Sequence, residues 1–281
     1  LGVLGLLTDS SPSEIPLTLV QLAVIALIQG LTEFLPISSS GHLILIPSVT
    51  GWQDQGLVID VAVHVGTLGA VMAYLWRDIW MMLKGMCRPG NVRRNPGLKM
   101  MAQLVVATIP VVIVGGLVFN HLGDMLRSAV VVGWATIGFG VLLYIADRFT
   151  VTINRVEHMT WGRALIIGIA QVFALIPGAS RAGTTITMAR WLGFERTEAA
   201  RFSMLMSIPA ILAAGAAATL KLIEDDAQHV LADAIVAGAM AFVAAFIAII
   251  LMMSWLKTAS FTPFVIYRLL LGVAILVWAY N

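Results

Sequence analysis

The stretch QGLTEFLPISSSGH (residues 29–42) sits inside an apolar segment, yet it carries an acid, three consecutive serines, a glycine and a histidine. A second stretch, PGASRAGTT (residues 177–185), interrupts another apolar segment in the same way and supplies an arginine. Polar side chains are costly at membrane depth, so two such clusters in an apolar chain predict a functional site. We therefore expect the rest of the chain to be a scaffold that brings the two clusters together.

The composition indicates an integral membrane protein. The 281 residues are 59% hydrophobic and 11% charged, with a mean hydropathy of +0.94. A soluble domain carries about a quarter charged residues, so this chain has too few charges to cover a soluble globule. The apolar runs are long and do not alternate with polar residues, which favours membrane-spanning helices over a β-barrel. We expect lipids as its surroundings and no nucleic-acid partner.

The apolar runs predict six transmembrane helices and two broken segments. The runs long enough to span are, approximately, 57–76, 101–119, 129–146, 199–220, 230–254 and 263–280. Residues 15–35 run into the serine cluster instead, and 163–176 and 183–194 are each too short to cross alone. Paired short segments of this kind are typical of re-entrant helices that meet near the membrane midplane. For residues 15–35, a full span is the alternative.

The basic residues predict the orientation. Of the 17 Lys and Arg, 13 fall in the predicted loops 77–99, 147–163 and 190–201 and at Lys257. Two others lie on the opposite side, and the last two, Arg181 and Arg268, lie within membrane segments. Cytoplasmic loops are rich in Lys and Arg, so both termini and the mouth of the first broken pair should face outward.

This arrangement predicts an inverted-topology repeat within one membrane domain over residues 1–281. Each half, 15–146 and 161–280, is a broken pair followed by three spans of opposite topology. The halves also echo each other weakly, with a slip of one residue between the two sets: Gln29, Pro36, Ser39 and Gly41 against Gln171, Pro177, Ser180 and Gly183. The predicted fold is therefore an all-α polytopic membrane protein with six transmembrane helices and two re-entrant helix pairs.

Arg181 is the first candidate site residue. Its guanidinium fork matches phosphate oxygens, and the N–H groups of a helix start bind anions. Ser180, Thr184 and Thr185 add hydroxyl donors beside it. A structural or snorkelling arginine is the alternative, but the nearest predicted loop is too far away for easy snorkelling.

The serine cluster resembles the other half of such an anion site. Ser38, Ser39 and Ser40, with Gly41, can present hydroxyl and backbone N–H groups at a second helix start. In an inverted repeat, the two positive helix ends would face each other at the midplane. Two facing anion sites suit a ligand with more than one phosphate.

Glu33 and His42 would be out of place in a simple anion receptor, because a carboxylate repels phosphate. They fit if Glu33 holds a divalent cation or acts as a base while His42 shuttles a proton. The alternatives are a buried acid paired with Arg181 for Glu33 and a core histidine for His42. Gln29 lies one turn before Glu33 and could orient a ligand or a metal-bound water.

Asp60 and His64 stand four residues apart on one face of a predicted span. They could line the cavity or pair with each other, and pairing is the interpretation we favour. The chain contains no P-loop, dinucleotide-binding fingerprint, zinc-protease motif or nucleophile elbow.

At these residues the chain resembles the undecaprenyl-diphosphate phosphatase family, bacterial membrane enzymes linked to bacitracin resistance. The resemblance covers nearly the whole chain and rests on residues 29–42 and 177–185, with support from DVAVHVGTLGAV (60–71) and RFSMLMSIPA (201–210). In the family's first motif, Glu or Gln precedes Glu by four positions, and this chain carries the Gln form. The family often has a serine after the arginine of the second motif, where this chain has Ala182.

The resemblance implies removal of the terminal phosphate from a C55 polyprenyl diphosphate, which recycles the lipid carrier for peptidoglycan synthesis and so supports cell shape. It implies a divalent cation, Mg²⁺ or Ca²⁺, and a multi-pass protein of the bacterial inner membrane with its site open to the periplasmic face. A homodimer is one option for the assembly. The residues fall into four roles: catalytic Glu33, Ser39, His42 and Arg181; phosphate-binding Ser38, Ser40, Gly41, Ser180 and Thr185; supporting Gln29; and metal-binding Glu33.

Several alternatives stay open. We favour Ser39 as the nucleophile, with His42 or Glu33 taking its proton, but a water activated by Glu33 or by a metal is the rival. A secondary transporter or polyprenyl-phosphate flippase would suit the same inverted scaffold. The acid-phosphatase-like lipid phosphatases share a Ser-Gly-His element, but they need a histidine after their Ser-Arg element, and residues 181–193 contain none.

Overall fold

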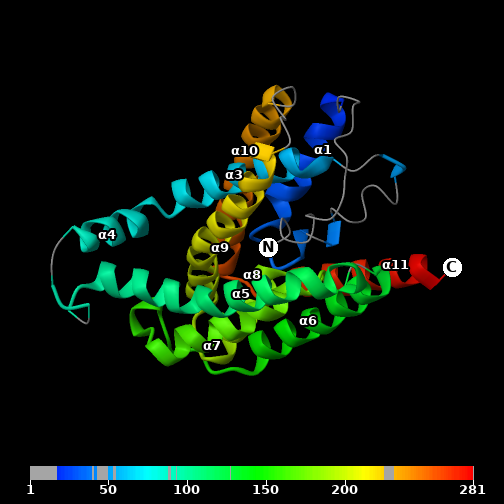
Figure 1. Cartoon of the computed structure of the whole chain (residues 1–281). Helices are drawn as coiled ribbons and strands as arrows, with labels where there is room; N and C mark the ends of the chain where they lie inside the picture. The colour runs from blue at the N-terminus through cyan, green and yellow to red at the C-terminus, as the bar shows by residue number, and fades with distance from the viewer. Residues whose placement is uncertain are drawn as a thin grey trace.

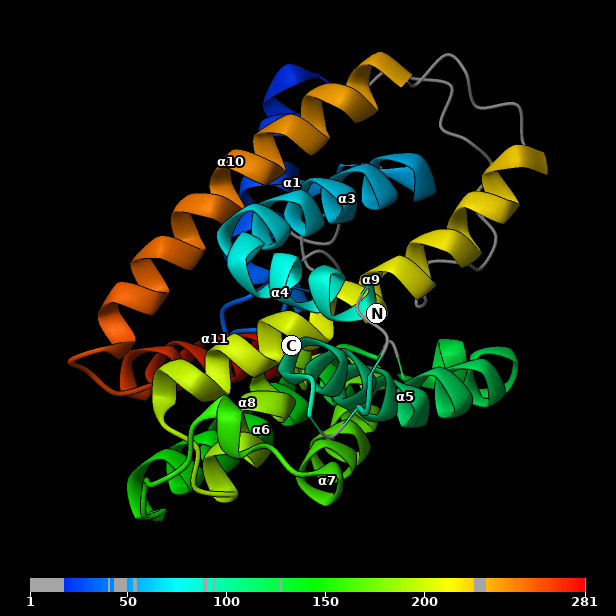
Figure 2. The same cartoon turned by 90° about the vertical axis from the view of Figure 1, so that its left-hand side faces the viewer.

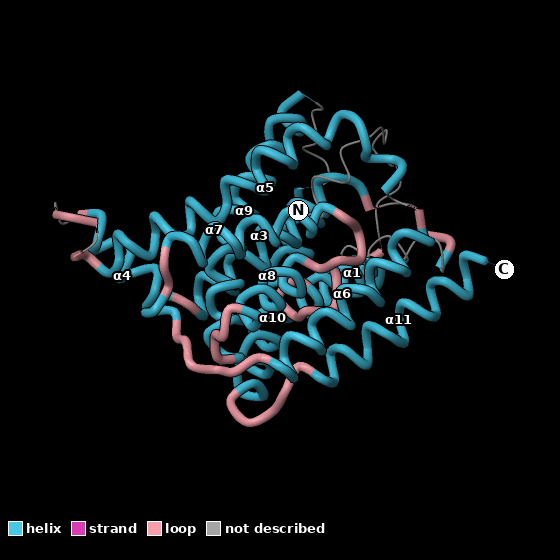
Figure 3. Tube along the Cα trace, turned by 90° about the horizontal axis from the view of Figure 1, so that it is seen from below, coloured by secondary structure: helices cyan, strands magenta, loops and turns pink. Residues whose placement is uncertain are grey.

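The computed structural model describes residues 18–39, 41–42, 50–52, 55–87, 90–92, 94–126, 128–224 and 231–280; the side chains of 118–126 and 217–224 are outside this description. The helices are α1 (Leu19–Thr32), α3 (Gly56–Tyr74), α4 (Trp76–Met86), α5 (Pro96–Leu126), α6 (Ala129–Phe149), α7 (Trp161–Val172), α8 (Arg181–Trp191), α9 (Arg196–Glu224), α10 (Leu231–Leu256) and α11 (Thr262–Tyr280) (Figure 1). Two 3-10 turns, Val156–His158 and Phe173–Leu175, complete the set. Figure 3 shows helix along most of the described trace.

Six helices are long and apolar enough to cross a membrane, which confirms the predicted spans. The crossing segments are Gly56–Tyr74, Pro96–Leu117, Ala129–Phe149, Arg196–Ala216, Leu231–Leu256 and Thr262–Tyr280. Helices suit such segments because lipid offers no hydrogen-bond partner and a helix satisfies its own backbone. Pro110 lies inside α5 and Pro209 lies inside α9. Membrane helices tolerate such internal prolines.

Besides α4, which has 11 residues, three helices are too short to cross. α1 has 14 residues, α7 has 12 and α8 has 11. At about 1.5 Å per residue they extend roughly 16 to 21 Å, against a hydrocarbon core of about 30 Å. The described helix α1 is therefore shorter than the full span that is the alternative for residues 15–35.

The short helices pack on the long ones in a reciprocal way. α1, from the first half of the chain, lies against α10 in the second half, and α7 of the second half lies against α5 of the first. Figure 2 shows α1 beside α10. Glycines permit both contacts: a Cβ on Gly30 would lie 2.6 Å from the Ala244 Cβ, and one on Gly168 would lie 2.3 Å from the Ala107 carbonyl oxygen.

Ion pairs and a hydrogen bond at Asp147 join the predicted cytoplasmic segments to one another. Asp147, near the end of α6, accepts hydrogen bonds from Nε of Arg190 at 3.0 Å and from Nε of Arg196 at 2.8 Å. The same carboxylate accepts the backbone N–H of Phe261, in the turn between α10 and α11. Segments that were predicted to share one side of the membrane are thus in contact with one another.

Candidate active site

Two serines begin the two polar stretches in the same conformation. Ser38 and Ser180 have φ angles of +77° and +70°, and no other described residue except glycine has a positive φ. This region is costly for a residue with a side chain and is found mainly at functional sites. Each serine hydroxyl then accepts the backbone N–H three residues later, from Gly41 at 3.4 Å and from Gly183 at 3.1 Å.

This geometry corrects the register of the sequence echo between the halves. Ser38, rather than Ser39, is the counterpart of Ser180, and the slip of one residue then remains only between Pro36 and Pro177. Three pairs then share a constant offset of 142 residues: Gln29 with Gln171, Ser38 with Ser180, and Gly41 with Gly183. In this register the counterpart of Ser39 is Arg181, so the two halves contribute different chemistry from equivalent positions.

Glu33 is the centre of the cluster. It follows the last turn of α1 and is 7% exposed. Its Oε2 accepts hydrogen bonds from Gln29 Nε2 at 2.8 Å and from Ser39 Oγ at 3.0 Å. Its Oε1 lies 3.4 Å from Nη2 of Arg181. One carboxylate therefore contacts a serine hydroxyl on one side and an arginine guanidinium on the other.

Arg181 is held in place but keeps a spare donor. The residue is 8% exposed, and its guanidinium lies 5.9 Å from the centre of the Phe34 ring. Nη1 donates to the Ser203 carbonyl at 3.1 Å, and Nη2 also reaches the Glu33 carbonyl at 3.4 Å. Nε has no acceptor among the described residues. The arrangement leaves Arg181 able to bind an incoming anion.

The Thr185 hydroxyl, predicted to bind phosphate, makes hydrogen bonds to Arg181 and Ser203. It donates to the Arg181 carbonyl at 2.8 Å and shares a 2.7 Å hydrogen bond with the Ser203 hydroxyl. Ser203 belongs to the stretch 201–210, so that stretch acts by holding the start of α8. The other predicted phosphate-binding hydroxyls are placed as follows: Ser38 and Ser180 cap their helices, and Ser40 lies outside the described residues.

His64 belongs to the cluster, although the sequence favoured its pairing with Asp60. That expectation of a side-chain pair is wrong: His64 Nδ1 donates to the Asp60 backbone carbonyl at 2.7 Å, and the Asp60 carboxylate accepts from Gln55 at 2.7 Å. His64 Nε2 lies 3.9 Å from Glu33 Oε2 and makes no hydrogen bond to the described residues. Because Nδ1 donates to the Asp60 carbonyl, Nε2 is the ring nitrogen left to face the Glu33 carboxylate.

His42 lies on a different side of the loop from Glu33. Its Nδ1 donates to the Ser38 carbonyl at 2.7 Å, and its Nε2 lies 2.6 Å from the Tyr267 hydroxyl on α11. The two rings are stacked with their centroids 5.7 Å apart. The geometry therefore brings Ser39 to Glu33 and brings His42 to Tyr267. Sequence reasoning missed Tyr267 because a single tyrosine in an apolar run is common in membrane helices, even when an arginine follows it.

Oxygen donors for a cation are limited to one carboxylate in this cluster. No group of three or more His, Cys, Asp or Glu side chains that could hold a metal occurs in the described part of the chain. The amide of Gln29 donates to Glu33 through Nε2, and its Oε1 atom is buried with no partner among those residues. One carboxylate and one amide oxygen fit a hard cation that takes its remaining ligands from a substrate's phosphates.

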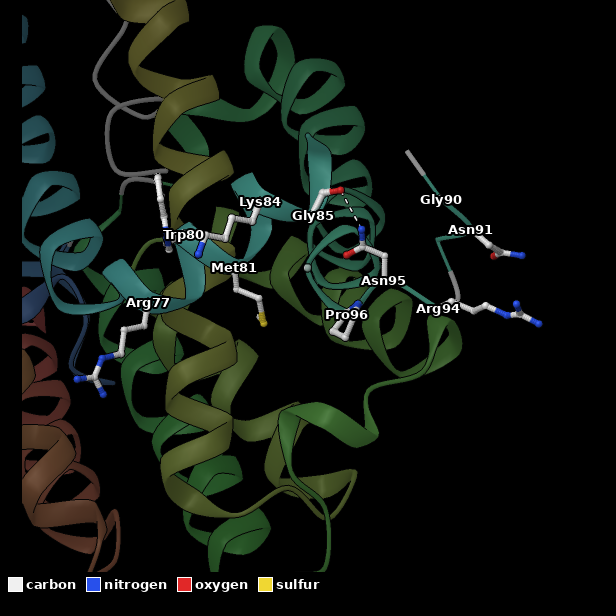
Figure 4. A pocket seen from close by; sticks show the side chains of 11 residues that line it. Arg77, Trp80, Met81, Lys84, Gly85, Gly90, Asn91, Arg94, Asn95 and Pro96 are labelled. Carbon is white, nitrogen blue, oxygen red and sulfur yellow. Dashed lines mark hydrogen bonds between the residues drawn. The ribbon is translucent and has the colours of Figure 1, made fainter. Parts of the chain in front are cut away.

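The cavity in Figure 4 lies elsewhere. It has a volume of about 780 Å³ and is lined by α4 and the start of α5, with none of the candidate site residues. Asn95 donates to the Gly85 carbonyl at 2.9 Å across it, while Arg77 and Arg94 extend outward on opposite sides. Its basic rim matches the predicted cytoplasmic charge and supplies no reacting group.

Comparison with known proteins identifies the relatives of this chain. Residues 22–274 match the family model described as bacitracin resistance protein BacA. The undecaprenyl-diphosphatase of Ruegeria pomeroyi is 51% identical over 268 residues, covering 94% of this chain and 100% of the relative. The undecaprenyl-diphosphatase of Roseobacter denitrificans is 48% identical with the same coverage, and undecaprenyl-diphosphatase 1 of Rhodospirillum rubrum is 47% identical over 93% of this chain and 95% of the relative.

Proposed function

This chain belongs to the bacitracin resistance protein BacA family, and we propose that it hydrolyses undecaprenyl diphosphate to undecaprenyl phosphate and inorganic phosphate. The observation that carries the proposal is the position of Glu33 between Ser39 Oγ and Arg181 Nη2. A nucleophile, a base and a phosphate-binding cation in contact are the parts that phosphoryl transfer requires. The relatives are named as hydrolases, so a transporter or flippase is not favoured.

In the first step Ser39 attacks the terminal phosphorus. Its hydrogen bond to Glu33 Oε2 gives the proton an acceptor, so Glu33 rather than His42 is the base that this geometry favours. A bond forms between Ser39 Oγ and phosphorus as the bridging P–O bond breaks, and undecaprenyl phosphate leaves. Water then attacks the phosphoserine, releases inorganic phosphate and regenerates the serine. A water activated by Glu33 remains the rival nucleophile.

Arg181 would stabilise the charge on the transferred phosphoryl group. Its 3.4 Å contacts to Glu33 are long for a charge-assisted hydrogen bond, and its Nε is free among the described residues. A phosphate entering the cluster offers this guanidinium better acceptors than one shared carboxylate oxygen. Displacing Arg181 from Glu33 would also make Glu33 a stronger base at the moment it is needed.

A divalent cation, Mg²⁺ or Ca²⁺, is part of the proposal. Glu33 and the Oε1 atom of Gln29 are the residues that would hold it, with the substrate's phosphates as further ligands. When bound, such an ion neutralises phosphate charge and acts as a Lewis acid. The chain's own residues orient the serine and carry its proton.

We also propose that the fold is a single domain built as an inverted repeat, with two re-entrant pairs. Three observations support it: the shortness of α1, α7 and α8, the reciprocal packing of α1 on α10 and α7 on α5, and the equivalent caps at Ser38 and Ser180. The Ser180 cap starts α8, and the Ser38 hydroxyl accepts the N–H of Gly41 in the helical residues that follow it. Both polar stretches would then meet near the midplane.

The orientation and location complete the proposal. The segments joined at Asp147 carry most of the basic residues and would face the cytoplasm, so the site would open to the periplasmic face of the bacterial inner membrane. A lipid diphosphate that presents its headgroup at that face could enter the cluster without its chain leaving the bilayer.

The function is tested with the full chain purified in detergent. We expect phosphate release from undecaprenyl diphosphate by the wild type, and none by Ser39→Ala. Ser254→Ala is the matched control, because Ser254 is an exposed serine on α10, far from the cluster in sequence and in fold. Failure of the wild-type protein to release phosphate at any cation concentration would reject the proposed function.

A further inference from the structure

Arg268 makes hydrogen bonds to both polar stretches, residues 29–42 and 177–185. It lies on α11 and its side chain is fully buried. Nη1 donates to the Pro36 carbonyl at 3.2 Å, and Nη2 donates to the carbonyls of Gly178 at 2.9 Å and Ala179 at 3.0 Å. Nε donates to the Thr136 carbonyl at 3.1 Å, which ties the same guanidinium to α6. One side chain thus holds both loops that carry the candidate site.

Among the described residues, the charge of Arg268 has no acidic partner. All of its hydrogen bonds go to backbone carbonyls, and it forms no ion pair with any residue that the structure describes. A buried cation without a counterion is costly, and one inside a membrane is a functional-site hypothesis by default. The cost is offset if an anion occupies the adjoining space during the reaction.

Arg268 also lies against the positive end of a helix. A Cβ built on Gly183, in the first turn of α8, would lie 2.4 Å from Arg268 Nη1, so the guanidinium sits directly beside that turn. Helix N-termini carry partial positive charge, which adds to the charge of the arginine instead of cancelling it. Arg181 begins the same helix. Positive charge is therefore concentrated around the first turn of α8.

The carbonyls that Arg268 holds also determine where the neighbouring amides point. In a trans peptide, the C=O of one residue and the N–H of the next lie on opposite sides. Because the Ala179 carbonyl is turned toward Arg268, the Ser180 N–H is turned away from it. The N–H groups of Ser180, Arg181 and Ala182 have no acceptor among the described residues. Successive free N–H groups beside a left-handed residue form a concave anion site.

We infer that Arg268 is a positioning residue for the phosphate. It holds the loops at Pro36 and at Gly178–Ala179 at a set separation, and it fixes the Ala179–Ser180 peptide with its N–H turned away from the guanidinium, so that the start of α8 keeps one orientation for binding. This inference rests on the proposed function, because it names how the same site holds its substrate. Lysine keeps the charge but cannot reach four carbonyls, since its ammonium has only three donors and no planar fork.

The test compares Arg268→Lys with the wild type in the full chain in detergent. The measured quantities are kcat, KM for undecaprenyl diphosphate, the inhibition constant of inorganic phosphate, and the rise in thermal unfolding temperature that phosphate causes. We expect the phosphate inhibition constant to rise at least about tenfold, the change that follows from losing one charge-assisted hydrogen bond. The inhibition constant does not depend on how many molecules are active, so partial misfolding cannot imitate this result.

A second variant moves the guanidinium without removing it. Gly183→Ala places a Cβ against Nη1 of Arg268, and Gly138→Ala is its control, because a Cβ at Gly138 meets nothing within 4 Å. We expect weaker phosphate inhibition in the first and wild-type behaviour in the second. If Arg268→Lys does not fold, the phosphate inhibition constant of Gly183→Ala decides whether Arg268 positions the phosphate.

An unchanged phosphate inhibition constant in folded Arg268→Lys, or in Gly183→Ala where that variant decides, overturns the inference and leaves Arg268 a structural residue. Wild-type protein that releases no phosphate from the lipid, yet is still stabilised by phosphate in an Arg268-dependent way, would reject the proposed function and keep the anion site.

Discussion

Glu33 and Arg181 are 148 residues apart in sequence, yet Oε1 of the carboxylate lies 3.4 Å from Nη2 of the guanidinium, with both side chains buried. The pair connects the end of α1 to the start of α8. It also leaves Glu33 Oε2 to Ser39 and Arg181 Nε to an incoming group. A pair this long is weaker than a tight, bidentate one, which suits two groups that must separate when phosphate enters.

Replacing Ser39 with alanine should abolish turnover and prevent formation of a phosphoenzyme, because Ser39 Oγ is the hydroxyl that donates to the Glu33 carboxylate. Rapid quenching with labelled lipid diphosphate, followed by detection of phosphoserine, measures the intermediate. Ser254→Ala should retain both signals. Substantial turnover by Ser39→Ala would point to water as the nucleophile.

Glu33→Gln should lower kcat by about 10²- to 10⁴-fold, the range expected when a general base is removed. The substitution keeps the size of the side chain and an oxygen for Ser39, so a loss of activity reports the missing charge. Steady-state kinetics on detergent-purified protein checks it, with the thermal unfolding temperature as a measure of folding. Near-normal kcat in folded protein would remove Glu33 from the mechanism.

Tyr267→Phe should lower activity by about fivefold, since it removes one neutral hydrogen bond worth about 1 kcal/mol from His42. Tyr144→Phe on α6 is the control, because Tyr144 is exposed and its hydroxyl makes no hydrogen bond to the described residues. Comparing kcat/KM for the two variants tests whether the His42–Tyr267 contact matters. Equal values for both would show that His42 needs no support from α11.

Chelation of divalent cations should abolish turnover, and Mg²⁺ or Ca²⁺ should restore it. Gln29→Ala should raise the cation concentration needed for half-maximal activity, because the Oε1 atom beside Glu33 is lost. A cation titration of phosphate release measures both effects. Full activity in excess EDTA would contradict the assignment of a cation to Glu33.

The orientation can be tested with Cys87, the single cysteine of the chain, which is exposed at the end of α4. A membrane-impermeant maleimide should label it in inside-out vesicles and not in intact spheroplasts, because the basic segment around it should be cytoplasmic. Cys87→Ser protein provides the blank. Labelling only from the outside would contradict the proposed orientation, and the site would then not open to the periplasm.

Much of the fold could be predicted from local sequence. Each predicted span lies within a few residues of a helix, because a bilayer requires about 20 apolar residues per crossing and their hydropathy is visible without tertiary information. The short helices followed from the same requirement, since Ser180 and its neighbours interrupt an apolar run. The register between the halves was one residue off, because the positive φ of Ser38 cannot be read from three identical serines.

The candidate site was only partly visible. Glu33, Ser39 and Arg181 stood out because each is polar within an apolar run, and the structure brings them into contact. Their roles in catalysis stay a prediction. His64 was assigned to Asp60 because helical spacing places the two on one face, whereas tertiary packing placed its Nε2 beside Glu33.

Sequence alone was sufficient for the membrane setting, the number of spans and the two polar stretches, because these depend on how individual segments partition between water and lipid. Only the tertiary structure decided which serine contacts Glu33, that Tyr267 holds His42, and that Arg268 joins the loops at Pro36 and Ala179. Those contacts link residues up to 232 positions apart. Helical periodicity determines which residues share a face of one helix, but the packing of several helices determines what that face meets.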